Sequence, residues 1–161
     1  MRIATIIYHL ALTFWVGGAA LFTFTLTPTL FRSYPRDMAG GIVGVLIPGY
    51  FYWGLTCGVI ALLCLFLTRT QGRSAKVASL LLVIMVSLTA AQAFLIVPRT
   101  AALKRDIPSF DTTPPDHPVR IQFRKLHGVS AVANLAVIAG GIFLVILTVP
   151  KTRDQDKIPA P

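Results

Sequence analysis

The stretch MAGGIVGVLIPGYFYWGLTCGVIALLCLFLT, residues 38–68, contains no Asp, Glu, Lys or Arg. A helix needs about 20 predominantly apolar residues to cross the hydrocarbon core of a bilayer, and this stretch exceeds that length. Lipid offers no hydrogen-bond partners to an exposed backbone, so the chain must satisfy its own amide groups there. The stretch therefore predicts a membrane-spanning α-helix.

The same pattern recurs on both sides of this stretch. Three further segments lack charged residues: 3–31, 77–98 and 126–150. They predict four spans in one membrane domain covering 1–161, at about 3–30, 42–68, 77–97 and 127–149, with a polar loop at 98–118 and a polar tail at 151–161. The predicted fold is an all-α, integral membrane four-helix bundle.

An amphipathic segment precedes the last predicted span. Val119, Phe123 and Leu126 repeat at helical spacing, whereas Arg120 and Arg124 fall elsewhere on that helix. Such a segment is typical of a helix at the membrane interface. We therefore expect an interfacial turn that leads into the fourth span.

The composition excludes a soluble domain. The chain has 161 residues, of which 55% are hydrophobic and 13% charged, and it contains no Glu. Soluble domains carry about 25% charged residues. The hydrophobicity also excludes disorder, and two cysteines exclude a disulfide framework. The first apolar run is about twice the length of a signal-peptide core, so we expect it to be a retained helix.

The charge distribution bears on orientation and partners. An even number of spans places both termini on one side of the membrane, and Lys plus Arg are nearly balanced between the two sides. The short basic segment 69–76 favours cytoplasmic termini in a multi-pass protein of a cell membrane, expected to be a bacterial inner membrane. Anionic lipid headgroups explain the net charge of +9 more simply than nucleic acid, for which no module is visible.

Polar and small side chains within the spans suggest how the helices pack. His127, Ser130 and Asn134 share one face of the fourth span, and Gln92 lies deep in the third. These side chains either hydrogen-bond across helices or mark a functional site. Gly54 and Gly58 form a small-residue face that serves either packing within the bundle or a homo-oligomer.

An ordered set of short motifs carries a family resemblance. They are Tyr8-His9-Leu10, Leu30-Phe31-Arg32-Ser33-Tyr34-Pro35-Arg36, Pro48-Gly49-Tyr50-Phe51, Pro98-Arg99-Thr100-Ala101-Ala102, and Phe123-Arg124-Lys125-Leu126-His127-Gly128-Val129-Ser130 followed by Asn134. With this set the chain resembles the transmembrane protein 205-like family, a domain family of unknown function. The resemblance implies four membrane helices and no established reaction. Some members are associated with resistance to platinum drugs, which implies transport or trafficking.

Most of the motif residues fall at one membrane face in the four-span topology. We expect them to form a basic, aromatic-rimmed pocket for an anionic lipid headgroup or a small acidic solute, because arginine binds phosphate and carboxylate through two hydrogen bonds. The expected ligand-binding residues are Arg32, Arg36, Tyr50, Arg99, Arg124, His127, Ser130 and Asn134. The alternative is that the arginines set the topology and extend toward headgroups.

His9 lies toward the opposite face. It serves either as a hydrogen-bonded structural residue or as a single ligand, and the His9–Trp15–Gly17 start is similar to copper-resistance protein D. His9 and His127 should be about 20 Å apart along the membrane normal, so they cannot share one metal or haem iron. We therefore expect no cofactor and no metal site.

Three functions remain at this stage. The favoured function is non-enzymatic: binding or moving an anionic lipid or small solute. The alternatives are a haem- or copper-associated redox protein and a membrane scaffold or assembly partner. A hydrolase has little support, because the spans contain no carboxylate and no nucleophile–base–acid set can be assembled.

Overall fold

A computed structural model describes residues 2–68 and 73–148, all within or between four long helices. Two of these helices each contain a short π-helical segment that divides them into labelled parts. In chain order the elements are α1 (Arg2–Ala20), η1 (Leu21–Leu26) and α2 (Thr27–Ser33); α3 (Arg36–Leu67); α4 (Arg73–Ala91), η2 (Gln92–Ile96) and α5 (Val97–Arg105); and α6 (Pro118–Thr148).

The four helices confirm the predicted all-α membrane fold. Each is 31 or 32 residues long and apolar enough to cross a membrane. At 1.5 Å per residue each helix is about 48 Å long, which exceeds the ~30 Å hydrocarbon core. The helix ends therefore extend into the headgroup regions, where the charged residues begin.

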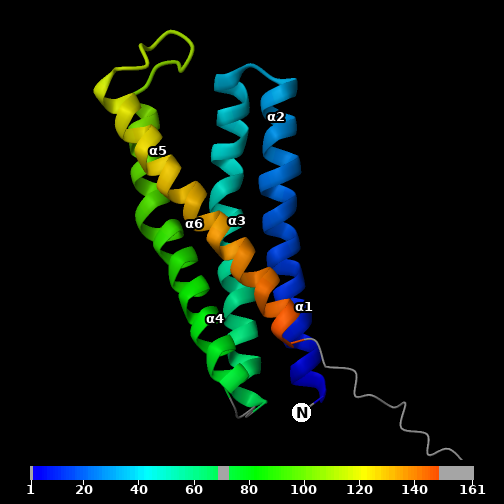
Figure 1. The fold of residues 1–161 in the computed structure, drawn as a ribbon. Coiled ribbons are helices and arrows are strands. Elements are labelled where there is room, and N and C mark those ends of the chain that lie inside the picture. The colour runs from blue at the N-terminus through cyan, green and yellow to red at the C-terminus, as the bar shows by residue number, and fades with distance from the viewer. Residues whose placement is uncertain (1, 69–72, 149–161) are drawn as a thin grey trace, which may run out of the picture.

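The helices run alternately up and down, so the start of α1 and the end of α6 lie at the same end of the bundle (Figure 1). We call this the terminal end. The opposite end carries the turn between α2 and α3 and the connection at 106–117, and we call it the loop end. Helix α6 is tilted: it packs on α5 at the loop end and on α1 at the terminal end (Figure 1).

The core lies in the terminal half, where α1, α3, α4 and α6 meet. Leu12, Leu82 and Leu144 are completely buried there, together with Met85 and Trp15. The Trp15 ring lies against Gly54 and Gly58, where a Cβ atom would come within 2.8 Å of it. These glycines therefore serve packing within the bundle, which was one of the two predicted uses of this face.

Two helices continue through a proline that was expected to lie near their ends. Proline has no N–H, and its ring collides with the carbonyl four residues earlier in an α-helix. The π-helical segment η1 precedes Pro28 and η2 precedes Pro98, and the wider π turn accommodates this disruption. The first helix consequently reaches Ser33, and α5 reaches Arg105 inside the predicted loop 98–118.

The amphipathic segment before the fourth span also differs in form from the prediction. Residues from Val119 onward belong to α6 itself, which begins at Pro118 and continues without a break to Thr148. The predicted interfacial turn is therefore the first part of one continuous helix, because α6 is longer than the hydrocarbon core requires.

Candidate functional site

The polar stripe of α6 faces the other helices in the loop-end half of the bundle. The Asn134 amide donates a hydrogen bond from Nδ2 to Thr23 Oγ1 at 2.8 Å, and its Oδ1 accepts one from the Tyr50 hydroxyl. The Tyr50 ring is stacked on Phe22, with ring centroids 4.5 Å apart. Asn134 therefore links α6 to η1 and α3 at once.

A second polar contact lies one helical turn along α6. Ser130 Oγ donates to Gln92 Oε1 at 2.9 Å, and Gln92 is 1% exposed. The Gln92 Nε2 atom is buried without a hydrogen-bond partner among the described residues. An amide left in this way costs about 1–3 kcal/mol unless a ligand or water accepts its hydrogens.

The two π-helical segments supply both of these contacts. Thr23 belongs to η1, Gln92 is the first residue of η2, and each bonds to the polar stripe of α6. A π turn inserts an extra residue and reorients the side chains that follow. Such turns are frequent at functional sites, so the position of Thr23 and Gln92 marks this region as the candidate site.

A column of aromatic rings continues from this polar cluster toward the loop end. The His127 ring is stacked on Phe123 with an interplanar angle of 3°, and Phe123 packs on Phe110 at 5.0 Å. The guanidinium groups of Arg36 and Arg120 lie 5.5 and 5.7 Å from the Phe110 ring centroid. Cations at such distances are attracted to the ring face.

The connection that carries Phe110 is tied to the start of α3. The Phe110 amide donates to Asp37 Oδ1 at 2.9 Å. Hydrogen bonds from Ser109 and from Phe110 hold the pKa of the Asp37 carboxyl below its usual value. Asp37 precedes the charge-free stretch 38–68, so this anchor lies at the polar edge of the bundle.

A lysine ties α5 to α3 at the same end. Lys104 Nζ donates to the carbonyl of Gly40, and a Cβ at Gly44 would lie 3.5 Å from the same nitrogen. Small residues let the ammonium group reach the helix backbone. Lys104 and Arg120, whose guanidinium donates to the Thr113 carbonyl, are therefore both held by backbone oxygens.

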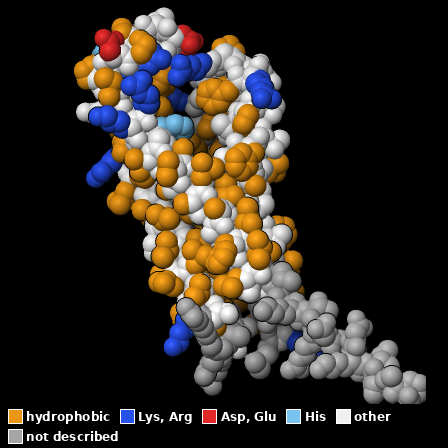
Figure 2. All heavy atoms as spheres, in the orientation of Figure 1, with side chains coloured by type: hydrophobic (Ala, Val, Ile, Leu, Met, Phe, Trp, Pro, Cys, Tyr) orange, Lys and Arg blue, Asp and Glu red, His pale blue; other side chains and the backbone are white. Residues whose placement is uncertain are grey.

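The surface of this end is basic and hollowed. Figure 2 shows Lys and Arg side chains gathered around a hollow at the loop end, while hydrophobic side chains cover the middle of the same face. The helices explain the hollow, because α2 packs on α3 and α5 packs on α6, whereas no packing joins α2 to α5 or α6 in the described residues.

The structure brings some of the predicted site residues together. Tyr50 bonds to Asn134, Ser130 bonds to Gln92, and Arg36 and His127 join the aromatic column through Phe110 and Phe123. It does not join the other three: Arg32 on α2, Arg99 on α5 and Arg124 on α6 are exposed and make no described contact with one another.

Gln92 and five further residues of this region were absent from the sequence-based set of ligand-binding residues. Thr23, Phe110 and Phe123 supply contacts, and Lys104 and Arg120 supply cations. The signal for Thr23 was its place five residues before Pro28, where a widened turn is needed. Nothing local in the sequence distinguishes Phe110, because its partners lie on α3 and α6.

The described residues contain no group of three or more His, Cys, Asp or Glu side chains able to hold a metal ion. His9 lies near the start of α1 and His127 near the start of α6, which begins at the opposite end of the bundle (Figure 1). His9 donates from Nδ1 to the Thr5 carbonyl at 2.8 Å. Whether His9 is a structural residue or a single ligand stays a prediction.

Comparisons with known proteins place the chain in a family. Residues 10–109, more than half of the chain, match the family described as "Domain of unknown function (DUF4149)". The chain belongs to this family. An uncharacterized protein of Aquifex aeolicus (strain VF5) is 31% identical over 130 residues, which cover 79% of this chain and 83% of the relative. No solved structure matches the chain.

The DUF4149 match covers the candidate site only in part. The matched residues include Thr23, Tyr50 and Gln92 but end before α6, which carries Ser130 and Asn134. The match agrees with the prediction of a domain of unknown function. Neither finding names the transmembrane protein 205-like family, so that finer resemblance stays a prediction.

Proposed function

We propose that this DUF4149 protein binds an anionic group, either a lipid headgroup or a small acidic solute, in the hollow at the loop end. Two observations support this proposal: the Nε2 atom of Gln92 is a buried donor without a partner among the described residues, and Lys and Arg side chains gather around the hollow (Figure 2). A ligand oxygen accepting from this amide would remove the cost of leaving it unpaired.

The basic side chains of the loop end are of two kinds: some are held by backbone oxygens and others are exposed without such a contact. Lys104 and Arg120 donate to backbone carbonyls and therefore organise this end. Arg32, Arg99 and Arg124 are exposed on three different helices. Each has a planar guanidinium that can bind two oxygens of a phosphate or carboxylate, so they are the groups proposed to capture the ligand.

The proposal extends to location and movement. The resemblance to the transmembrane protein 205-like family implies that the protein transports its ligand as well as binding it. A bacterial inner membrane is the proposed location. Cytoplasmic termini are proposed because three basic residues, Arg69, Arg73 and Lys76, fall within the short segment 69–76. Labelling of single cysteines at Ser33 and Gln71 tests the orientation: only Ser33→Cys should react with an impermeant reagent added from the periplasmic side.

Native mass spectrometry of the purified full chain tests binding directly. The protein in nonionic micelles is incubated with dioleoyl phosphatidylglycerol or dioleoyl phosphatidylcholine, which share acyl chains and differ in headgroup charge. We expect phosphatidylglycerol to bind at least fivefold better. Soluble glycerol phosphate is added as a competitor, and its success would show that a free acidic solute occupies the same place.

Charge variants locate the binding. Arg99→Gln and Arg124→Gln should each lower phosphatidylglycerol binding severalfold. Lys76→Gln removes the same charge at the exposed start of α4, at the terminal end, and should leave binding unchanged. Equal losses of phosphatidylglycerol binding in all three variants would show that the lipid responds only to the total charge of the protein. Unchanged binding in Arg32→Lys, Arg99→Lys and Arg124→Lys would rule out two-oxygen recognition by these arginines.

A further inference from the structure

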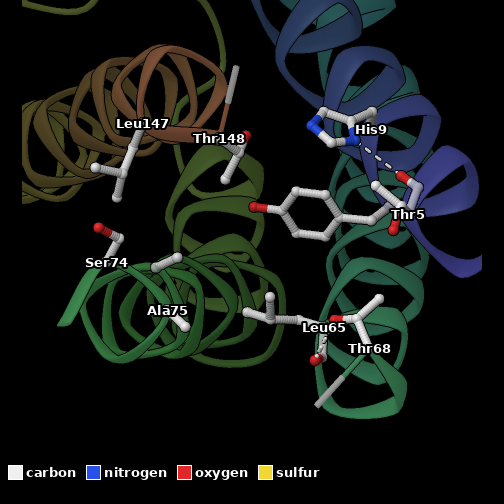
Figure 3. A pocket seen from close by; sticks show the side chains of 10 residues that line it. Thr5, His9, Leu65, Thr68, Ser74, Ala75, Leu147 and Thr148 are labelled. Atoms are coloured by element: carbon white, nitrogen blue, oxygen red, sulfur yellow. Dashed lines mark hydrogen bonds between the residues drawn. The ribbon is translucent and has the colours of Figure 1, made fainter. Parts of the chain in front are cut away.

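A separate cavity lies at the terminal end of the bundle, opposite the proposed anion site. Its volume is about 320 Å³, and residues of α1, α3, α4 and α6 line it. Figure 3 shows His9 and Thr5 on one side, Leu65 and Thr68 below them, and Ser74, Ala75, Leu147 and Thr148 on the other side. The volume corresponds to roughly ten water molecules of about 30 Å³ each, enough for the head of a small organic ligand.

The cavity contains a buried hydroxyl without a hydrogen bond. Tyr8 lines the cavity and is 3% exposed. Its hydroxyl lies near Thr148 but makes no hydrogen bond of acceptable geometry within the described residues. Thr148 instead donates to the Leu144 carbonyl at 2.7 Å. A buried hydroxyl in this state is a donor for which the described residues supply no well-placed acceptor.

The neighbouring imidazole has a fixed orientation. His9 Nδ1 lies 2.8 Å from the Thr5 carbonyl oxygen, which can only accept, so Nδ1 carries the hydrogen (Figure 3). In the neutral ring Nε2 then keeps its lone pair. The His9 and Tyr8 rings are perpendicular with centroids 5.1 Å apart, so the two rings lie side by side on α1.

The lining residues decide the charge of the ligand. They include no Asp, Glu, Lys or Arg among the described side chains, and the walls formed by Leu65, Ala75, Ala78 and Leu147 are apolar. An ionised ligand would lose hydration without gaining a counter-charge from these lining residues. A neutral molecule with an apolar body and one oxygen acceptor loses little, and it satisfies the Tyr8 hydroxyl.

We propose that this cavity binds a neutral, lipid-soluble molecule through a carbonyl oxygen that accepts the Tyr8 hydrogen. The carbonyl can belong to a ketone-type molecule dissolved in the bilayer or to an ester of a neutral glyceride. The site is independent of the anion site, because it lies at the other end of the bundle and uses a different set of residues.

Three probe molecules with hydrocarbon chains of similar length test whether the cavity recognises a carbonyl group. The full chain in nonionic micelles is titrated with 2-dodecanone, dodecane or laurate, and the midpoint of thermal unfolding gives an apparent affinity, because a ligand of the folded state raises that midpoint. We expect 2-dodecanone to bind at least tenfold better than dodecane and better than laurate. Dioctanoylglycerol is tested as a fourth ligand. If it binds more tightly than 2-dodecanone, the carbonyl that the site recognises belongs to a glyceride ester.

Variants of the lining residues test whether the Tyr8 hydroxyl makes the contact with the ligand carbonyl. Tyr8→Phe should weaken 2-dodecanone about tenfold and leave dodecane unchanged, whereas Tyr52→Phe, at an exposed tyrosine of α3 outside the cavity, should change neither. Ala75→Leu narrows the cavity and should weaken both probes. Equal affinity of 2-dodecanone and dodecane, equal affinity of wild type and Tyr8→Phe for 2-dodecanone, or preference for laurate would each overturn the proposal.

The same variants separate this site from the proposed function. Tyr8→Phe should leave phosphatidylglycerol binding unchanged, and Arg124→Gln should leave 2-dodecanone binding unchanged. Loss of both ligands in a variant that keeps the wild-type unfolding midpoint without ligand would show that one site serves both ligands, and it would contradict the independence of the cavity.

Discussion

Asn134 on α6 donates a hydrogen bond to Thr23 in η1 at 2.8 Å, although 111 residues separate them in the chain. The same Asn134 side chain accepts from Tyr50 on α3. One amide thus holds three of the four helices together at the level where the terminal-half core ends and the loop-end hollow begins. In a membrane this matters because lipid competes poorly for polar contacts but competes well for apolar ones.

Replacing Asn134 by Leu should destabilise the bundle. The change removes both hydrogen bonds and leaves the Tyr50 and Thr23 hydroxyls without this partner, so we expect a loss of about 1–2 kcal/mol in the free energy of unfolding. Unfolding in mixed micelles of increasing SDS content measures it. Ser79→Ala is the matched control, because Ser79 bonds only to the Ala75 carbonyl of its own helix. A loss no larger than that of the control would show that Asn134 does not hold the helices.

Replacing Gln92 by Leu separates stability from binding. The change removes a buried unpaired amide, which favours the folded state. It also removes the hydrogen bond from Ser130, whose hydroxyl can turn to a carbonyl of its own helix, so the unfolding free energy should not fall by more than about 1 kcal/mol. Phosphatidylglycerol binding should nevertheless fall several-fold in native mass spectra. A clear loss of stability with normal lipid binding would instead make Gln92 a packing residue.

Alanine at position 58 should be costly, whereas alanine at position 49 of the same helix should not. A Cβ on Gly58 would lie 2.8 Å from both Trp15 and Val86, but a Cβ on Gly49 meets nothing within 4 Å. Overpacking of this kind costs about 1–3 kcal/mol. The unfolding free energies of Gly58→Ala and Gly49→Ala in the same micelles provide the comparison, and similar values would argue against the close approach of Trp15.

Acid should release the 106–117 connection from α3. The pKa of Asp37 is lowered in the folded protein by hydrogen bonds from Ser109 and Phe110. A lowered pKa contributes stability that is present above the unfolded value of 3.8 and is lost as the pH falls through the lower folded value. Exchange of the Phe110 amide hydrogen, corrected for its intrinsic pH dependence, should therefore accelerate below that range.

Asp37→Asn provides the control for this acid release. The asparagine keeps an oxygen acceptor but has no proton to gain, so the corrected exchange of Phe110 should no longer depend on pH in this range. Pronounced acid release in the variant would assign the effect to another group.

The sequence predicted the helices more accurately than their ends. The absence of charge over 38–68 and three similar stretches sufficed for four spans, because a backbone in lipid has only its own groups to bond. The predicted spans 3–30 and 77–97 end close to Pro28 and Pro98, and proline breaks an α-helix by local geometry. The helices continue because the π turns η1 and η2 accommodate the prolines, and a choice between ending and widening depends on neighbouring helices.

Residues of the candidate site could be predicted from the sequence only where they belong to a pattern within one helix or follow from the order of the spans. Spacing along one helix placed Ser130 and Asn134 on a common face, and topology placed Tyr50 near the same interface. That these residues bind a ligand stays a prediction. Phe110 and Lys104 could not be recognised, because their roles depend on Asp37 and Gly40, which are more than 60 residues away in the chain.

The sequence by itself determined that this chain forms four apolar helices with its charged groups confined to their ends, because the free energy of transferring charge and unpaired backbone into lipid depends on each segment alone. Only the tertiary structure decided which polar groups meet. The tilt of α6 brings Asn134 to Thr23 and leaves the Tyr8 hydroxyl facing a cavity, since the angle between packed helices follows from the combined shapes of their side chains.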